Sequence, residues 1–193
     1  NLEGTCNIAG LVGDNRGTII ACYVTGSVRG EYYYAGGLVG NNDGAVTTCY
    51  TTCIVSGDDI VGGLVGMNTR NGTIKASYAS GSVSGISDGV GGLIGKNYGI
   101  ITSCFWDLQS SGQVGSSGGK GLTTEQMKNM SFFQNAGWTD KGWVMQDGAD
   151  YPRLGWENTG GVPIPSSVIP FSGNGTAKEP YLISTPEIGR AHV

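Results

Sequence analysis

A glycine-framed tetrapeptide occurs four times in this chain at nearly constant spacing, and this repeat restricts the fold more than any other feature. Each copy reads Gly-Leu-Val-Gly or Gly-Leu-Ile-Gly, and the copies begin at Gly10, Gly37, Gly63 and Gly92. The spacings of 27, 26 and 29 residues lie in the range typical of solenoids and other repeat arrays. The chain is therefore predicted to be a stack of similar coils.

Further positions repeat in step with the tetrapeptide. Each copy carries an asparagine, a glycine, an aliphatic residue, a small thiol or hydroxyl residue and an aromatic residue, in that order. In the second copy these are Asn42, Gly44, Val46, Cys49 and Tyr50. Short apolar stretches separated by Gly, Asn, Ser and Thr indicate three strands per unit, joined by turns. No unit has room for an uninterrupted helix of ordinary length.

A single unit is too small to fold alone. Each buried aliphatic side chain contributes about 1.5–3 kcal/mol, whereas ordering each residue costs roughly 1–2 kcal/mol of backbone entropy. Stacked units share strand hydrogen bonds at a spacing of about 4.8 Å and bury a continuous apolar column. The sequence therefore predicts an all-β fold, a parallel β-solenoid of about four coils.

Equivalent residues of such coils lie above one another. One predicted ladder is Leu11, Leu38, Leu64 and Leu93, and a second is Ile19, Val46, Ile74 and Ile101. The cysteine and tyrosine positions are adjacent, and a corner is expected between them. Which of these two ladders faces the interior stays open at this stage.

The character of the chain changes after the last repeat. Residues 4–111 are predicted to form the solenoid, and residues 112–158 a small, aromatic-rich capping region. That region is expected to contain a short helix in which Thr123 and Gln126 form a capping box. Its aromatic residues are expected to cover the open strand edge of the last coil, which a repeat array needs for solubility.

The remaining segments do not continue the pattern. Residues 159–170 are predicted to be a Pro/Gly linker, and residues 171–187 the truncated start of a further module. Residues 188–193 match the translation of a common sequencing adapter, which would make His192, the only histidine, foreign to the natural protein. The chain is expected to be a fragment, so the lack of a visible signal peptide carries no information.

The repeat resembles a known family. The run from Gly36 to Tyr50 is similar to the GLUG-motif repeats of large bacterial secreted and surface proteins, including some IgA-specific peptidases and adhesin-like chains. The resemblance covers about residues 4–107. It implies a β-solenoid, export to the extracellular space or cell surface, and a passenger or stalk role without catalytic residues. The sequence departs from the pattern at Cys53 and at Trp106-Asp107, where the third strand of two coils would lie.

Candidate catalytic and metal-binding residues are few. The acids Asp43, Asp58, Asp59 and Asp88 occupy turn positions. Paired carboxylates in a solenoid groove could serve glycoside or pectate chemistry or bind calcium. The preference of aspartate for turns is the favoured interpretation, because no acid pair repeats on neighbouring coils.

The five cysteines offer no metal site either. No two of them have the Cys-x-x-Cys spacing of a metal site. The five are Cys6, Cys22, Cys49, Cys53 and Cys104. Buried free thiols are favoured over a Cys22–Cys49 disulfide, because side chains stacked in one ladder lie parallel and not face to face. We therefore predict no catalytic residue, no cofactor and no metal, and the fragment is not expected to be an enzyme.

Three successive tyrosines, Tyr32, Tyr33 and Tyr34, are the candidate ligand contacts. They cannot all point inward from one strand, and an exposed tyrosine suits contact with a glycan or a host or cell-surface protein. Exposure without a function is the favoured interpretation, and ligand contact is the alternative. A net charge of −4 and the absence of a Lys/Arg cluster argue against nucleic acid. No stretch approaches the ~18 apolar residues of a membrane span.

Two functional hypotheses remain at this level. The first is a non-catalytic repeat segment of a large bacterial secreted or cell-surface protein, acting as an adhesin-like stalk or display scaffold. The alternative is a non-catalytic portion of a secreted peptidase or polysaccharide-degrading enzyme whose active site lies outside this sequence. The ligand, the organism, the coil handedness and the full-length domain content are not determined by the sequence.

Overall fold

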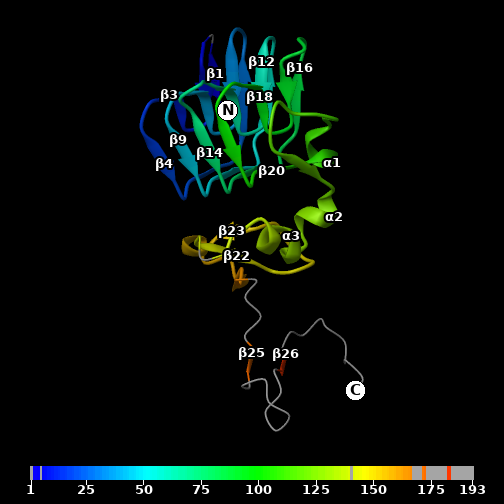
Figure 1. Cartoon of the computed structure of the whole chain (residues 1–193). Coiled ribbons are helices and arrows are strands. Elements are labelled where there is room, and N and C mark those ends of the chain that lie inside the picture. Colours follow the sequence, from blue (N-terminus) through cyan, green and yellow to red (C-terminus); the bar gives the residue numbers. More distant parts are fainter. Residues whose placement is uncertain (1, 5, 140, 167–170, 173–181, 184–193) are drawn as a thin grey trace.

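The computed structural model describes residues 2–4, 6–139 and 141–166, together with the backbone of residues 171–172 and 182–183. Four coils stack side by side into a parallel β-solenoid, and a small helical and antiparallel region follows (Figure 1). The predicted fold class is confirmed.

Each complete coil contains five short strands, two more than the sequence indicated. The first coil has β2 (Ile8–Ala9), β3 (Val12–Asn15), β4 (Thr18–Ile20), β5 (Tyr23–Val24) and β6 (Ser27–Gly30). The second has β7 (Tyr34–Gly36), β8 (Val39–Asn42), β9 (Ala45–Thr47), β10 (Tyr50–Thr51) and β11 (Ile54–Gly57). The third has β12 (Ile60–Gly62), β13 (Val65–Asn68), β14 (Thr73–Lys75), β15 (Tyr78–Ala79) and β16 (Val83–Gly85). The fourth has β17 (Val90–Gly91), β18 (Ile94–Asn97), β19 (Ile100–Thr102) and β20 (Phe105–Asp107).

Equivalent strands pair in parallel and form five sheets along the stack. These are β1-β6-β11-β16, which begins with β1 (Leu2–Gly4), then β2-β7-β12-β17, β3-β8-β13-β18 and β4-β9-β14-β19, and last β5-β10-β15-β20-β21, which ends with β21 (Lys120–Leu122). The predicted aliphatic ladder is confirmed, because Val46 lies opposite both Ile19 and Ile74, and Ile74 lies opposite Ile101.

The two departures from the repeat have different outcomes. After Cys53 the strand β11 forms normally and pairs with β6 and β16. In the fourth coil the helix α1 (Leu108–Ser111) replaces the missing strand. Asp107 begins that helix, because its carboxylate accepts the backbone N–H groups of Gln109 and Ser110.

The leucine ladder lies in the solenoid core. Leu38, Leu64 and Leu93 are fully buried, whereas Leu11 of the first coil is 47% exposed because no described coil stacks on its outer side. The same core contains Cys49 and Cys104, so the cysteine ladder faces the interior.

The corner beside the cysteine ladder lies one position earlier than expected. The residues that precede the cysteine or serine of each coil adopt left-handed backbone conformations, with φ of 52° at Ala21, 55° at Thr48, 45° at Ala76 and 52° at Ser103. The expectation of a corner between the cysteine and the tyrosine is therefore wrong. After this corner the strand alternation sends the cysteine inward and the tyrosine outward, so the two ladders pack on opposite sides of the same sheet.

The repeated asparagines form a ladder of polar side chains inside the stack. The amide nitrogen Nδ2 of each asparagine donates to the Oδ1 of the next: Asn15 to Asn42 at 2.7 Å, Asn42 to Asn68 at 2.8 Å, and Asn68 to Asn97 at 2.8 Å. Asn42 and Asn68 are fully buried. The ladder satisfies these polar groups, which would otherwise destabilise the fold.

Replacing Asn68 by alanine is therefore expected to destabilise the protein by about 1–3 kcal/mol, because the Oδ1 of Asn97 and the Nδ2 of Asn42 both lose a buried partner. Denaturant titration monitored by circular dichroism measures the loss. Asn71→Ala, at an exposed turn position, is the matched control and should change stability by less than about 0.5 kcal/mol. Equal losses in the two variants would contradict a structural role of the ladder.

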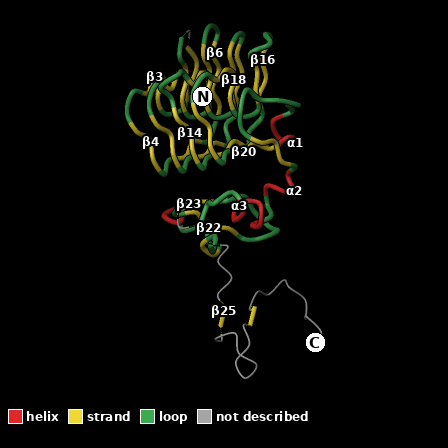
Figure 2. Tube along the Cα trace, viewed as in Figure 1, coloured by secondary structure: helices red, strands yellow, loops and turns green. Residues whose placement is uncertain are grey.

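The end of the last coil is closed by the segment that leads to β21. The backbone N–H of Gly92 donates to the carbonyl oxygen of Gly115, and Ser116 Oγ accepts the N–H of Ile94. The predicted short helix is confirmed as α2 (Thr124–Met127), with the capping box between Thr123 and Gln126. In the part of the chain that the structure describes, the helices follow β20, the last strand of the fourth coil (Figure 2).

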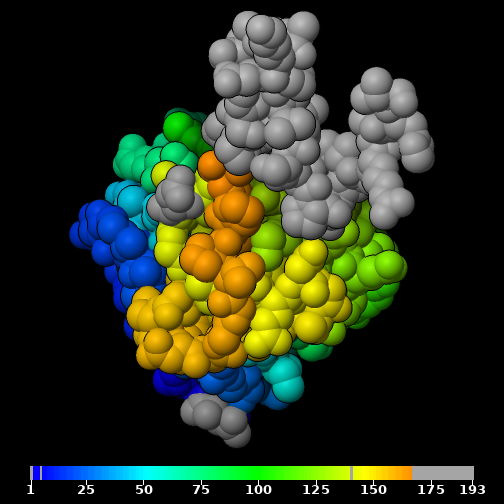
Figure 3. Space-filling view, turned by 90° about the horizontal axis from the view of Figure 1, so that it is seen from below, coloured from blue at the N-terminus to red at the C-terminus, as the bar shows by residue number. Residues whose placement is uncertain are grey.

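The aromatic-rich region does not cover the strand edge, so that expectation is wrong. It comprises α2, α3 (Met130–Asn135), β22 (Trp143–Met145), β23 (Arg153–Leu154), η1 (Gly155–Glu157) and β24 (Val162–Pro163). We call residues 123–164 the lateral cap, because they lie along the side of the stack, beneath the sheet that contains the tyrosine ladder (Figure 1, Figure 3). The tyrosine ladder is the apolar surface that the lateral cap covers. Residues 112–122 are the segment that closes the end of the last coil.

The predicted linker at residues 159–170 includes ordered structure at its start. β24 pairs with β22, and Ile164 is buried in the cap. In the predicted further module at residues 171–187, β25 (Phe171–Ser172) pairs with β26 (Leu182–Ile183). The rest of that module, and the adapter-like residues 188–193 with His192, lie outside the described residues.

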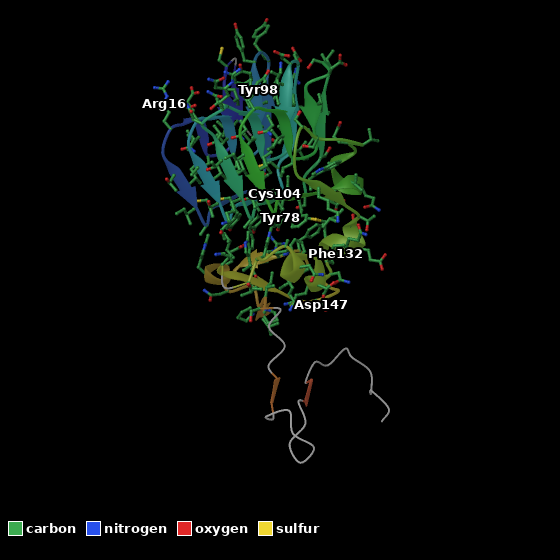
Figure 4. All side chains as sticks on the ribbon, viewed as in Figure 1. Arg16, Tyr78, Tyr98, Cys104, Phe132 and Asp147 are labelled. Carbon is green, nitrogen blue, oxygen red and sulfur yellow. The ribbon has the colours of Figure 1, made fainter. Side chains whose placement is uncertain are left out.

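Stacked aromatic rings join the solenoid to the lateral cap. The ring of Tyr50 stacks on Tyr23 and on Tyr78 with centroid distances of 5.0 Å in both cases. Figure 4 shows Tyr78 on the side of the solenoid that faces the cap. Trp138 and Trp143 of the cap pack against these rings, so the outward-facing ladder forms a second core.

Candidate functional site

Three loops form the edge of the solenoid that lies opposite the lateral cap (Figure 1). They follow β6, β11 and β16 and contain residues 31–33, 58–59 and 86–89. We call them the rim. The strands on either side are in register, since Gly30, Gly57 and Gly85 lie opposite one another. The coils are therefore alike where they stack and different at the rim.

The rim carries the candidate tyrosines. Tyr32 is 61% exposed and Tyr33 is 58% exposed, whereas Tyr34 is half-buried and begins β7 opposite Ile60. Tyr33 has a left-handed backbone with φ of 58°, and its ring lies 6.3 Å from that of Tyr34. Two of the three residues are thus accessible to a ligand, and their binding role stays a prediction.

A shallow groove of about 210 Å³ lies beside the rim. Its polar lining comes from Arg29, Ser56, Asp58 and Ser84, and Ile86 adds an apolar side chain. No side-chain hydrogen bond or ion pair joins any of these four polar residues to another described residue, so their polar groups are free to meet a ligand. Sequence reasoning missed this groove, although a polar residue precedes a glycine at the same position in three repeats.

The turn acids lie in two parts of the solenoid. Asp43 accepts hydrogen bonds from Thr69 and Asn71, which hold the pKa of its carboxyl below the usual value. Asp58, Asp59 and Asp88 are exposed at the rim. Among the described residues, no three or more His, Cys, Asp or Glu side chains are grouped so that they could hold a metal ion.

The cysteines are free thiols in the structure. Burial raises the pKa of Cys49 and of Cys104 to about 12, so both stay protonated at neutral pH. A buried thiol of this kind is a core side chain and a poor nucleophile.

A polar cluster between the solenoid and the lateral cap was also missed by the sequence. The hydroxyl of Tyr50 donates to Glu157 at 2.8 Å and accepts from Arg153 at 3.1 Å. The hydroxyl of Tyr151 donates to the buried carboxylate of Asp107 at 2.6 Å. Burial raises the pKa of Tyr50 and of Tyr151, so these hydroxyls act as donors.

This cluster positions the cap and is not a candidate site, because its polar groups are used in internal contacts. Asp107, for example, also accepts from Thr124 and from two backbone N–H groups at the start of α1. The hydrogen bonds between Tyr50 and the cap join residues more than 100 positions apart, so no local spacing could have indicated them.

Comparison with known proteins identifies the repeat. The family described as "The GLUG motif" matches residues 59–84, which is the third coil from the rim loop before β12 to β16. The chain therefore contains the GLUG motif that its repeats resemble. Its strands show that the motif builds one coil of a parallel β-solenoid.

One relative extends the comparison. A protein of Evansella cellulosilytica with the name "Putative Gly-rich membrane protein" is 39% identical over 101 residues, which are 48% of this chain and 11% of the relative. The chain thus spans about a tenth of that relative's length. No solved structure matches. Among the described residues, no helix is long and apolar enough to cross a membrane.

Proposed function

We propose that this chain is a non-catalytic segment of a bacterial cell-envelope or secreted protein, where it acts as an adhesin-like stalk or display scaffold. The observation that carries the proposal is the contrast between stacking and rim positions. Buried ladders of leucine and asparagine repeat from coil to coil, whereas the three rim loops carry different side chains on the same frame. A rigid frame with variable exposed loops is the usual arrangement of repeat proteins that present binding surfaces.

The comparisons support an envelope location. The relative from Evansella cellulosilytica is named as a Gly-rich membrane protein, and the matched 101 residues are a small part of it. A repeat segment inside a much longer surface protein would space or present other parts of that protein. Partners would be a glycan or a protein at a host or cell surface, contacted through Tyr32 and Tyr33.

Binding through the rim is the testable consequence. Beads coated with the full chain are expected to bind members of a panel of immobilised glycans and extracellular proteins. A Tyr32→Ser/Tyr33→Ser variant is expected to lose about tenfold or more of that binding, because the exposed rings supply the apolar contact area. Tyr34 is left unchanged because it is half-buried and belongs to the strand β7.

Tyr98→Ser is the matched control, since Tyr98 is also exposed, at 54%, but lies in the turn between β18 and β19. This variant should bind like the wild type. Unchanged binding by the rim variant would overturn the proposed contact. Cleavage of a panel member that is lost in Asp58→Ala/Asp59→Ala would instead contradict the proposal that this segment is non-catalytic.

A further inference from the structure

We propose that the groove beside the rim binds a neutral, linear oligosaccharide that runs along the solenoid axis, with one sugar ring over each coil. This inference rests on the proposed display function and specifies the ligand of that surface. It is carried by Arg29, Ser56, Asp58 and Ser84, four polar side chains without partners among the described residues.

The register of the sheet gives the groove a regular repeat. Arg29 lies opposite Ser56, and Ser56 lies opposite Ser84, so the three coils place polar side chains in one line. Neighbouring strands are about 4.8 Å apart, which is close to the length of one pyranose ring in an extended chain. A linear glycan along this line meets an equivalent position at each successive sugar.

The lining has the hydrogen-bonding chemistry that sugar hydroxyls require. The guanidinium of Arg29 only donates, the carboxylate of Asp58 only accepts, and the hydroxyls of Ser56 and Ser84 do both. A sugar hydroxyl can donate and accept at once, so it can pair with each of these groups. Arg29 lies beside Asp58 in the groove lining and opposite Glu3 in the sheet, so this surface has no excess of positive charge, which favours a neutral glycan over a polyanion.

The rim also exposes large aromatic and aliphatic side chains. Tyr32 and Tyr33 belong to the first coil, and Ile86, which is 83% exposed, belongs to the third. Amphipathic tyrosine rings can stack on the C–H faces of a sugar while their hydroxyls stay in water. The rim therefore carries surfaces suited to the ring faces of a sugar.

An extended peptide fits this surface less well. Peptides that bind sheets usually add a strand to an open edge and exchange backbone hydrogen bonds. Here β6 is paired with β1 and β11, and β11 is paired with β6 and β16, so these two strands have no free edge at the groove. β16 is the last strand of this sheet, and the side-chain amide of Gln113 already donates to its Val83 carbonyl oxygen. Recognition by side chains is therefore favoured, which suits a ligand rich in hydroxyl groups.

The test is titration of the full chain with defined ladders of cello-, manno- and xylo-oligosaccharides from one to six sugars. We expect affinity for at least one ladder to rise from one to three sugars and then to level off, because the groove crosses three coils. Arg29→Ala and Asp58→Asn are each expected to weaken binding about tenfold, the effect of losing one charged hydrogen-bonding partner. Ser84→Tyr, which fills the groove, should abolish the gain from the third sugar.

Arg16→Ala is the matched control, because Arg16 is an exposed arginine in the turn between β3 and β4, away from the rim (Figure 4). It should leave binding unchanged, and circular dichroism should show that each variant keeps the wild-type fold. The absence of millimolar binding to all three ladders, affinity independent of length, or tighter binding of an oligogalacturonate ladder would overturn the inference.

The rim variant separates this inference from the proposed function. If Tyr32→Ser/Tyr33→Ser loses binding while Arg29→Ala and Ser84→Tyr retain it, the rim binds but the groove does not, and only the inference fails. If the partner bound through the rim is a protein that the groove variants still bind, the inference is likewise wrong. If no variant affects any binding, both proposals fail.

Discussion

Replacing Trp138 by alanine is expected to destabilise the protein by about 3–5 kcal/mol, the usual loss for a large buried aromatic side chain. Trp138 is fully buried between the solenoid and the lateral cap. Its ring lies 4.7 Å from that of Trp143 and 4.8 Å from that of Phe133, and its indole N–H donates to the carbonyl oxygen of Ser103 at 2.9 Å. The substitution removes these contacts and leaves a cavity at the centre of the second core.

Denaturant titration followed by tryptophan fluorescence and circular dichroism measures this effect. Trp156→Ala is the matched control, because Trp156 also belongs to the cap and contacts the first coil, but it is 57% exposed. Its loss should be about 1 kcal/mol or less. If Trp138→Ala were no more destabilising than Trp156→Ala, the cap would not be packed on the solenoid as described.

Replacing Leu64 by alanine is expected to cost about 2–5 kcal/mol. Leu64 is fully buried in an interior coil, and its backbone is hydrogen-bonded to Leu38 on one side and to Leu93 on the other. Both neighbouring coils would line the resulting cavity. Because strands on both sides hold the backbone in register, little collapse of the site is expected.

Leu11→Ala is the matched control for this prediction. The residue occupies the same position of the repeat but is 47% exposed, so about half of its transfer free energy is absent and no closed cavity forms. Its loss should be about 1 kcal/mol. Similar losses of stability in the two leucine variants would contradict the ladder.

The candidate site could be predicted from the sequence only in part. The exposure of tyrosine in the Tyr32–Tyr34 run followed from the alternation of side chains along a strand, and the structure places Tyr32 and Tyr33 in solvent. The groove was missed because it is made of single polar residues from three coils, which become neighbours only when the coils stack. The sequence feature that Arg29, Ser56 and Ser84 share is the glycine that follows each of them, and it does not indicate a groove.

The sequence by itself determined the solenoid, the register of its coils and the short helix after Thr123. These features depend on interactions that repeat at one period or act within a few residues, so the pattern of glycine, leucine and asparagine expresses them directly. The asparagine ladder is an example, since Asn42 and Asn68 are equivalent in the repeat and are hydrogen-bonded in the structure.

Only the tertiary structure decided where the lateral cap lies, which ladder it covers and where the corner of the wall falls. The Tyr50–Glu157 hydrogen bond and the packing of Trp138 on Tyr78 join segments that share no period. Their partners are selected by shape and burial across the folded stack, because the outward tyrosine rings form an apolar face that must be covered. That requirement acts between distant segments, so it leaves no pattern within either of them.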